Sequence, residues 1–182
     1  MSGSTAGNVI TATHFAADKH KGQRRKDVEG TPYINHPIAV AELLTRVAGV
    51  TDVATIQAAL LHDTIEDTCT TGAELETRFG KDVRQLVEEL TDDKSLPSTE
   101  RKRLQIKHAS ILSPRARLIK LADKICNLAD LTQSAPVGWL VERKREYLDW
   151  AEKVVAKIRG SNPALEKLFD ETLSEKRHII GL

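Results

Sequence analysis

The chain is poor in cysteine and in aromatic residues. Only two of its 182 residues are cysteines, Cys69 and Cys126, and they form neither a CxxC pair nor a zinc-finger spacing. Aromatic residues make up 4% of the chain, so the core must be built from Leu, Ile, Val and Ala, which suits packed helices better than a β-sandwich. The composition therefore predicts an α-helical protein, and the scarcity of cysteine indicates a reducing, cytoplasmic location.

Charge of one sign, long apolar runs and a targeting signal are also missing. The chain has 27 Lys and Arg against 26 Asp and Glu, a net charge of +1, whereas a nucleic-acid-binding domain usually has a clear basic excess. No apolar run approaches the ~18 residues of a membrane-spanning helix. The N-terminus lacks the basic and apolar regions of a secretory signal. We therefore expect neither nucleic acid nor a membrane as a partner.

Apolar residues recur at helical spacing along most of the chain, and no segment reads convincingly as a strand. We expect an all-α fold of roughly nine helices. A short flexible segment over residues 1–8 should precede a single domain over residues 9–182. One continuous helix is expected over residues 52–67, and Pro136 should break the chain. Residues typical of helix N-caps mark the expected starts: Asn8, Asn35, Asp52, Thr71 and Asn162.

The stretch AALLHDTIED places four polar side chains at the end of an apolar run: His62, Asp63, Glu66 and Asp67. Burying such groups costs several kcal/mol each unless they are paired, and one divalent cation can pair several of them. On a continuous helix, Glu66 shares a face with His62, and Asp67 shares a face with Asp63. A cation touching His62 and Asp63 would leave the two later acids one turn further out.

Two further candidates are His36 in YINHPIAV and Asp123 in KLADKICNL. Asp123 lies between apolar Leu121 and Ile125, an unfavourable place for an unpaired carboxylate. A mixed site of two His and two Asp favours Mn²⁺, Mg²⁺ or Fe²⁺ over structural zinc. An octahedral ion with four protein ligands keeps two positions, for water and a phosphate oxygen. The alternative is a His–Asp dipeptide without function beside a solvated acidic helix end.

In order along the chain, these motifs resemble the HD superfamily, and most closely the animal-type small alarmone hydrolases. These are stand-alone relatives of the hydrolase half of bifunctional (p)ppGpp synthetase/hydrolases. The resemblance runs from about Thr13 to Trp150 and rests on HKGQRRKDVEGTPYINHP, AALLHDTIEDT, VEELTDDKSLP, ERKRLQ, KLADKICNL and GW…ER…EY. It implies a compact all-helical HD fold with a very short β-like excursion near residues 24–33. It also implies hydrolysis of ppGpp or pppGpp to GDP or GTP and pyrophosphate.

The resemblance also implies roles for single residues. The ligands implied for one Mn²⁺ per chain are His36, His62, Asp63 and Asp123. The residues implied to orient or deprotonate the attacking water are Glu66 and Asp67. Those implied for the substrate are Arg25, Lys26 and Tyr33 around the nucleotide, Asn127 beside the metal, and Arg143 on a phosphate. Arg and Lys suit a substrate with two pyrophosphate arms.

One position departs from the family pattern. Relatives often carry a Lys just after the DDKxLP motif, where this chain has Ser98. The basic role can pass to Arg101 or Lys102, or the second phosphate arm is held less tightly. Three other functions stay open: removal of the 2′-phosphate of NADPH, another HD-type nucleotide phosphohydrolase activity, and a nucleotide-binding scaffold without chemistry. The oligomeric state stays open as well.

Overall fold

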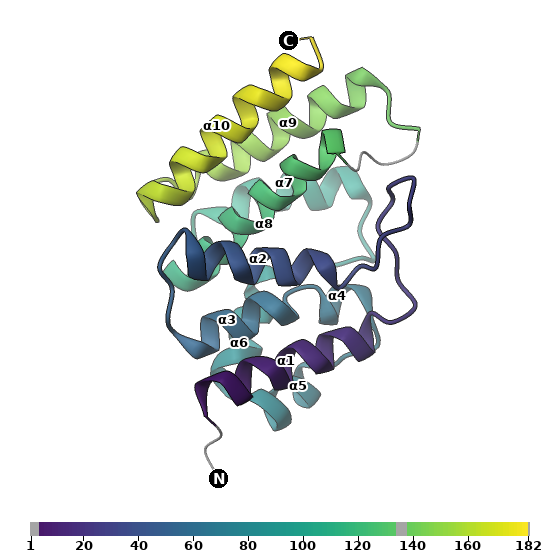
Figure 1. Cartoon of the computed structure of the whole chain (residues 1–182). Coiled ribbons are helices and arrows are strands. Elements are labelled where there is room, and N and C mark those ends of the chain that lie inside the picture. The colour runs from purple at the N-terminus through teal and green to yellow at the C-terminus, as the bar shows by residue number, and fades with distance from the viewer. Residues whose placement is uncertain (1–3, 134–137, 182) are drawn as a thin grey trace.

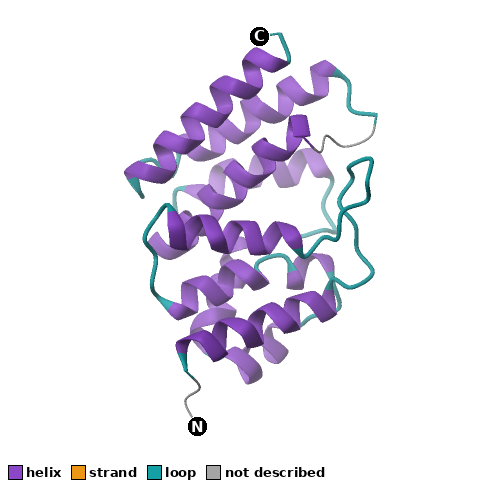
Figure 2. Ribbon diagram, in the orientation of Figure 1, coloured by secondary structure: helices purple, strands orange, loops and turns teal. Residues whose placement is uncertain are grey.

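A computed structural model describes residues 4–133 and 138–181, and Figures 1 and 2 show these residues as a bundle of helices joined by loops. The described part contains ten helices. They are α1 (Thr5–Lys19), α2 (Asn35–Arg46), α3 (Val53–Leu61), α4 (Thr64–Asp67), α5 (Gly72–Phe79), α6 (Lys81–Leu90), α7 (Ser98–Ala109), α8 (Pro114–Gln133), α9 (Val141–Ala156) and α10 (Pro163–Ile179). The all-α prediction is confirmed, while Pro136 lies outside the described residues.

Helix α8 is the central element of the bundle. It packs against α2, α3 and α6 on one side and against α9 and α10 on the other. Figure 1 shows α9 and α10 at one end of the molecule and α1 with α5 at the opposite end, with α2 and α8 between them. Residues of α8 can therefore contact both halves of the bundle.

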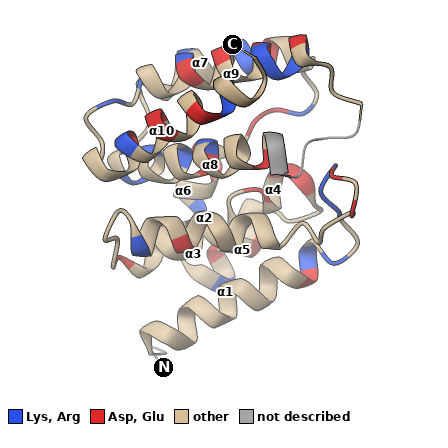
Figure 3. Ribbon diagram, turned by 45° about the horizontal axis from the view of Figure 1, so that its top comes forward, with Lys and Arg blue, Asp and Glu red and all other residues tan. Residues whose placement is uncertain are grey.

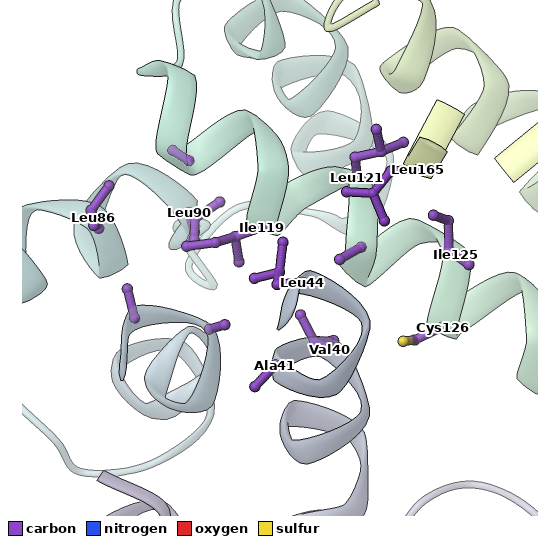
Figure 4. Packing of buried hydrophobic residues seen from close by; sticks show 14 of the residues in the cluster. Val40, Ala41, Leu44, Leu86, Leu90, Ile119, Leu121, Ile125, Cys126 and Leu165 are labelled. Carbon is purple, nitrogen blue, oxygen red and sulfur yellow. The ribbon is translucent and has the colours of Figure 1, made fainter. Parts of the chain in front are cut away.

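The core is aliphatic, as the composition predicts. Figure 4 shows side chains of α2, α6 and α8 meeting, among them Leu44, Leu90 and Ile119. All three are less than one-tenth exposed, and Leu121 on α8 is fully buried. Burying an aliphatic side chain of this size contributes about 1.5–3 kcal/mol, so α8 is held firmly between its neighbours.

Local cap chemistry explains most helix starts. The predicted caps Asp52, Thr71 and Asn162 each accept a hydrogen bond from a backbone N–H of the helix they precede. The prediction was wrong at Asn8, because α1 already begins at Thr5 and is capped by Ser4. It was also wrong at Asn35, which lies inside α2. There the turn before α2 continues directly into the helix, because Ile34 already has a helical backbone conformation and the Asn35 N–H donates to the Pro32 carbonyl at 3.1 Å.

The continuous helix expected over residues 52–67 is broken at His62 and Asp63, which separate α3 from α4. Two side chains bond to the last carbonyl groups of α3. The Thr64 hydroxyl donates to the Leu61 carbonyl at 2.6 Å, and His62 Nδ1 lies 2.7 Å from the Ala59 carbonyl. Such bonds compete with the helical ladder. The break changes the directions of the side chains on which the metal-site prediction depends.

The loop between α1 and α2 is pinched by an isolated antiparallel bridge between Arg24 and Pro32. This confirms the expected β-like excursion near residues 24–33. Gly30, at the tip, has a φ of 62°, a conformation that glycine adopts without strain. Along this loop the basic residues come first and the acidic residues follow, as the blue and red parts in Figure 3 show. In the described ranges, no helix combines the length and apolarity that crossing a bilayer requires.

Candidate functional site

Three buried side chains from distant segments converge near the loop between α1 and α2. His36 comes from α2, His62 from the break between α3 and α4, and Asp123 from the middle of α8. One nitrogen or oxygen of each lies within 4.8 Å of the others. Asp123 Oδ1 is 3.1 Å from His36 Nε2 and 3.8 Å from His62 Nε2. The three side chains therefore form a group that can bind a divalent cation.

Asp63 lies at the edge of this group. Its Oδ2 atom is 3.0 Å from His62 Nε2 and 3.9 Å from His36 Nε2. The same oxygen accepts a hydrogen bond from the Tyr33 hydroxyl at 2.6 Å. All four side chains expected to bind metal thus face one another, and the break in the helix lets the consecutive residues His62 and Asp63 both do so.

The buried imidazole nitrogens fit a cation. The Ala59 carbonyl can only accept a hydrogen bond, so His62 Nδ1 carries a proton and Nε2 is the nitrogen that points into the group, where its lone pair is available to a cation once its own proton is lost. That Nε2 atom is buried, and carboxylate oxygens of Asp63 and Asp123 lie 3.0 and 3.8 Å from it. A lone pair facing carboxylate oxygens needs a positive charge between them. Holding the far nitrogen on a carbonyl is also how metal-ligating histidines are oriented.

The charges of the group attract a proton when no cation is present. Burial acts to lower the pKa of His62, but the carboxylates of Asp63 and Asp123 outweigh it and raise the pKa to about 9. Burial likewise acts to raise the pKa of Asp63, yet the neighbouring imidazoles hold it well below its usual range. A bound cation would replace the proton of His62 as the partner of these carboxylates.

Asp123 has further partners around it. Lys124 Nζ lies 3.0 Å from Asp123 Oδ2, and Asn127 Nδ2 donates to Oδ1 at 2.6 Å. Arg25 in turn donates to the Asn127 side-chain oxygen at 3.2 Å and pairs with Asp130. This chain of contacts joins the carboxylate of α8 to the basic segment of the loop between α1 and α2.

The acidic pair expected to act on water lies on α4. One oxygen of the Glu66 carboxylate accepts the Asp92 backbone N–H at 3.0 Å, and the other lies 3.4 Å from the Arg101 guanidinium. Burial and the nearby carboxylate of Asp92 raise the pKa of Glu66. Asp67 pairs with Lys94. The two acids are therefore fixed by different partners.

A cavity of about 200 Å³ opens beside the group. Its lining residues are Arg24, Arg25, Lys26, Tyr33, Asn127, Asp130, Leu131, Trp139 and Tyr147. Four of the five residues expected to bind substrate are among them. The fifth, Arg143, is not, because its exposed guanidinium stacks 4.4 Å from the ring centre of Trp139 at the edge of the cavity.

Sequence reasoning assigned no role to Asp130, Trp139 or Tyr147, although all three line the cavity. The sequence did contain a signal for two of them. Trp139 and Tyr147 belong to the GW…ER…EY segment on which the family resemblance rests. Their rings lie 5.7 Å apart.

Arg101 and Lys102 are the two candidates to replace the basic residue that is missing at position 98. They lie on different sides of α7. Arg101 points to Glu66, as described above. The ammonium group of Lys102 lies over the rings of Trp150 and Tyr147, at 5.4 and 5.8 Å from their centres. Tyr147 lines the cavity, so Lys102 contacts one of the cavity's lining residues.

Comparisons with known proteins agree with this geometry. Residues 12–149 match the model of the HD domain family. Guanosine-3′,5′-bis(diphosphate) 3′-pyrophosphohydrolase MESH1 of Homo sapiens is 55% identical over 174 residues, which cover 96% of this chain and 97% of that protein. The protein of the same name from Drosophila melanogaster is 51% identical over 162 residues, covering 89% and 90%.

A solved structure of a metazoan orthologue of SpoT, described as hydrolysing ppGpp, superposes with a TM-score of 0.90. It is 49% identical in sequence, and the match covers 93% of this chain and 95% of that one. Sequence and fold lead to the same relatives along almost the whole length. We conclude that the chain belongs to the HD domain family and, within it, to the group of MESH1 3′-pyrophosphohydrolases.

Proposed function

We propose that the chain is a metal-dependent 3′-pyrophosphohydrolase of ppGpp and pppGpp. It releases pyrophosphate from the 3′ position of the ribose and leaves GDP or GTP. The observation that supports this most directly is the convergence of His36, His62 and Asp123 beside a cavity lined by basic and aromatic side chains. The relatives described above carry this activity in their names.

One divalent cation, Mn²⁺, is held by His36, His62, Asp63 and Asp123. The mixture of imidazole and carboxylate donors is compatible with this ion. When bound, the cation supplies Lewis-acid polarisation of a phosphate oxygen and lowers the pKa of a neighbouring water molecule towards neutrality. The chain contributes the orientation of the donors, through the Ala59 carbonyl on His62 and the Tyr33 hydroxyl on Asp63.

Glu66 and Asp67 orient the attacking water and accept its proton. The water oxygen bonds to the phosphorus attached to the 3′ oxygen, and the bond between that phosphorus and the 3′ oxygen breaks. The 3′ oxygen leaves as a hydroxyl after it takes up the proton that the carboxylate accepted from the water. Burial raises the pKa of the half-buried Glu66, and a raised pKa makes a carboxylate a better proton acceptor. Its hydrogen bond from Asp92 fixes the direction of the carboxylate.

The cavity binds the nucleotide. Arg25 and Lys26 offset the charge of the phosphates, and Tyr33 and Asn127 connect the cavity to the metal donors. The flat face of Trp139 supplies apolar contact area for a base. Arg143, stacked on Trp139, reaches a phosphate from the edge.

Pyrophosphate release from ppGpp, measured with Mn²⁺ and with excess chelator, tests the proposal. Chelator should abolish release. Glu66→Gln should reduce kcat by about 10²- to 10⁴-fold, because it removes a proton acceptor but no metal donor. Mn²⁺ affinity, measured by titration calorimetry, should not change.

Glu76→Gln on α5 is the matched control, because Glu76 is an exposed carboxylate paired with Arg84. Full turnover in Glu66→Gln, or full turnover with chelator, would contradict the proposal. The same assay with NADPH, followed by phosphate release, separates the two ribose-phosphate substrates. A larger kcat/KM for NADPH would transfer the assignment to the 2′-phosphatase activity.

A further inference from the structure

The four side chains proposed to bind the cation, His36, His62, Asp63 and Asp123, are called the metal group below. Lys124 is a buried lysine in direct contact with this group through Asp123. It follows Asp123 on α8, and only 3% of its surface is exposed. Its ammonium nitrogen lies 3.0 Å from Asp123 Oδ2, whereas Asp123 Oδ1 faces His36 Nε2 at 3.1 Å. The two oxygens of one carboxylate thus have separate partners, the donor group on one side and the lysine on the other.

The other side of the ammonium group meets an aromatic ring. Lys124 Nζ lies 4.4 Å from the ring centre of Trp150 on α9. Trp150 is itself fixed, because its indole N–H donates to the Lys102 carbonyl on α7 at 3.1 Å. The ring of Tyr147 packs against it at 5.2 Å. Helices α7 and α9 therefore determine where the lysine can lie.

The position of the lysine matters because a carboxylate can rotate about its side-chain bonds. A metal donor must keep one oxygen directed at the ion, and a partner on the second oxygen restricts that rotation. Within the described residues, Asn127 donates to Oδ1, and Lys124 is the group that holds Oδ2. An ammonium group this deeply buried needs both its carboxylate and its aromatic partner.

We propose that Lys124 is a positioning residue of the metal centre. Held between Asp123 Oδ2 and the indole ring of Trp150, it fixes the Asp123 carboxylate so that Oδ1 faces His36 and His62. It thereby couples metal affinity to the packing of α8 against α9. This inference rests on the proposed metal-dependent function.

The test is the binding of Mn²⁺ to the full chain without nucleotide, measured by titration calorimetry and by the electron paramagnetic resonance signal of free Mn²⁺. Lys124→Met should weaken binding by about 10- to 100-fold, the usual effect of losing an outer partner. Lys124→Arg should restore most of the affinity, because a guanidinium can donate to the carboxylate and stack on the indole. Trp150→Leu, which keeps the lysine, should weaken binding by roughly threefold.

Lys176→Met is the matched control. Lys176 is also 3% exposed and paired with a carboxylate, that of Glu175, but it lies on α10. Circular dichroism establishes that each variant is folded. Wild-type affinity in Lys124→Met, or an equal loss in Lys176→Met, would overturn the inference while leaving the proposed function intact. If Lys124→Met does not fold, an unchanged affinity in Trp150→Leu overturns it instead. Failure of the wild-type chain to bind Mn²⁺ would overturn both.

Discussion

The metal group is built from two kinds of helical position, and they differ in how the backbone presents the side chains. At the junction of α3 and α4 the helix breaks, so the consecutive residues His62 and Asp63 can both face the group. In α8 the helix continues through Asp123, and consecutive residues diverge by about 100°. There a single carboxylate enters the group, and its neighbour Lys124 turns towards α9.

The two positions also differ in what surrounds the carboxylate. Asp63 is 20% exposed and accepts a hydrogen bond from the Tyr33 hydroxyl, which belongs to the loop region before α2. Asp123 is 12% exposed and is held by groups of its own helix, Lys124 and Asn127. The comparison indicates that the α8 side is fixed by the packed core and the α3–α4 side by a surface loop.

The largest difference between the two positions is expected when the negative charge of each carboxylate is removed in turn. Asp123→Asn should weaken Mn²⁺ binding by more than about 100-fold, beyond the loss of an outer partner. It should also lower the free energy of unfolding by about 3–5 kcal/mol without metal, because it leaves the buried ammonium group of Lys124 without its carboxylate. Asp63→Asn should weaken binding comparably but cost less stability. Titration calorimetry and urea unfolding in chelator measure the two quantities.

Asp170→Asn serves as the control for that pair, because Asp170 is an exposed carboxylate on α10 that pairs with Arg159. It should change neither quantity appreciably. Equal stability losses in Asp123→Asn and Asp63→Asn would show that the distinction between the core side and the loop side is wrong.

A smaller change tests the loop side alone. Tyr33→Phe removes the hydroxyl that donates to Asp63 but keeps the ring, which packs on His20 with ring centres 4.9 Å apart. Mn²⁺ affinity should fall by about tenfold, at the lower end of the range for outer partners. Tyr147→Phe removes a hydroxyl from the same cavity without touching a metal donor, and its Mn²⁺ affinity should match that of the wild type. Identical Mn²⁺ affinities in both variants would show that the Tyr33 hydroxyl has no role in metal binding.

The smallest effect is expected at the start of α3. Asp52→Ala removes the cap that accepts the Thr55 N–H at 3.0 Å, and should lower the free energy of unfolding by about 1 kcal/mol. Thr71→Ala at the start of α5 is the matched cap on a helix without metal donors. Neither variant should alter Mn²⁺ affinity, and a loss confined to Asp52→Ala would show that the cap also aligns His62.

The same cap should respond to acid. Hydrogen bonds from Thr55, and then the charge of Arg115, hold the pKa of Asp52 below its usual range. A depressed pKa means that the stabilisation is complete above the ordinary aspartate pKa of about 4 and is lost as the pH falls towards the depressed value. Urea unfolding of Asp52→Ala and wild type should therefore converge at low pH.

Features set by neighbouring residues were predictable from the sequence. The caps at Asp52, Thr71 and Asn162 depend on one side chain and the next turn. The bridge between Arg24 and Pro32 was expected only from the resemblance to the HD superfamily, because local residue types predict no more than a loop there. The candidate metal-binding residues stood out because polar groups in apolar runs need partners. The residues converge as expected, but the assumed continuous helix over residues 52–67 does not exist. The helix breaks where the side chains of His62 and Thr64 bond to the last carbonyls of α3, and helical spacing in the sequence does not reveal these bonds.

Features set by distant segments were not predictable. In KLADKICNL, Lys124 looks like an ordinary surface lysine of an amphipathic helix. Its burial depends on Trp150, which reaches it only because α9 packs against α8. The stacking of Arg143 on Trp139, and so its place at the edge of the cavity, likewise depends on tertiary packing.

The donors of the metal group come from three separate stretches of the chain, and these are adjacent only when α2, α3 and α8 are assembled. An unfolded polypeptide has no comparable site, so an ion bound as proposed would favour the native state and shift the folding equilibrium towards it. Each tenfold excess of free ion over its dissociation constant adds about 1.4 kcal/mol to native-state stability. The supply of the metal would therefore affect the stability of the folded protein as well as its rate.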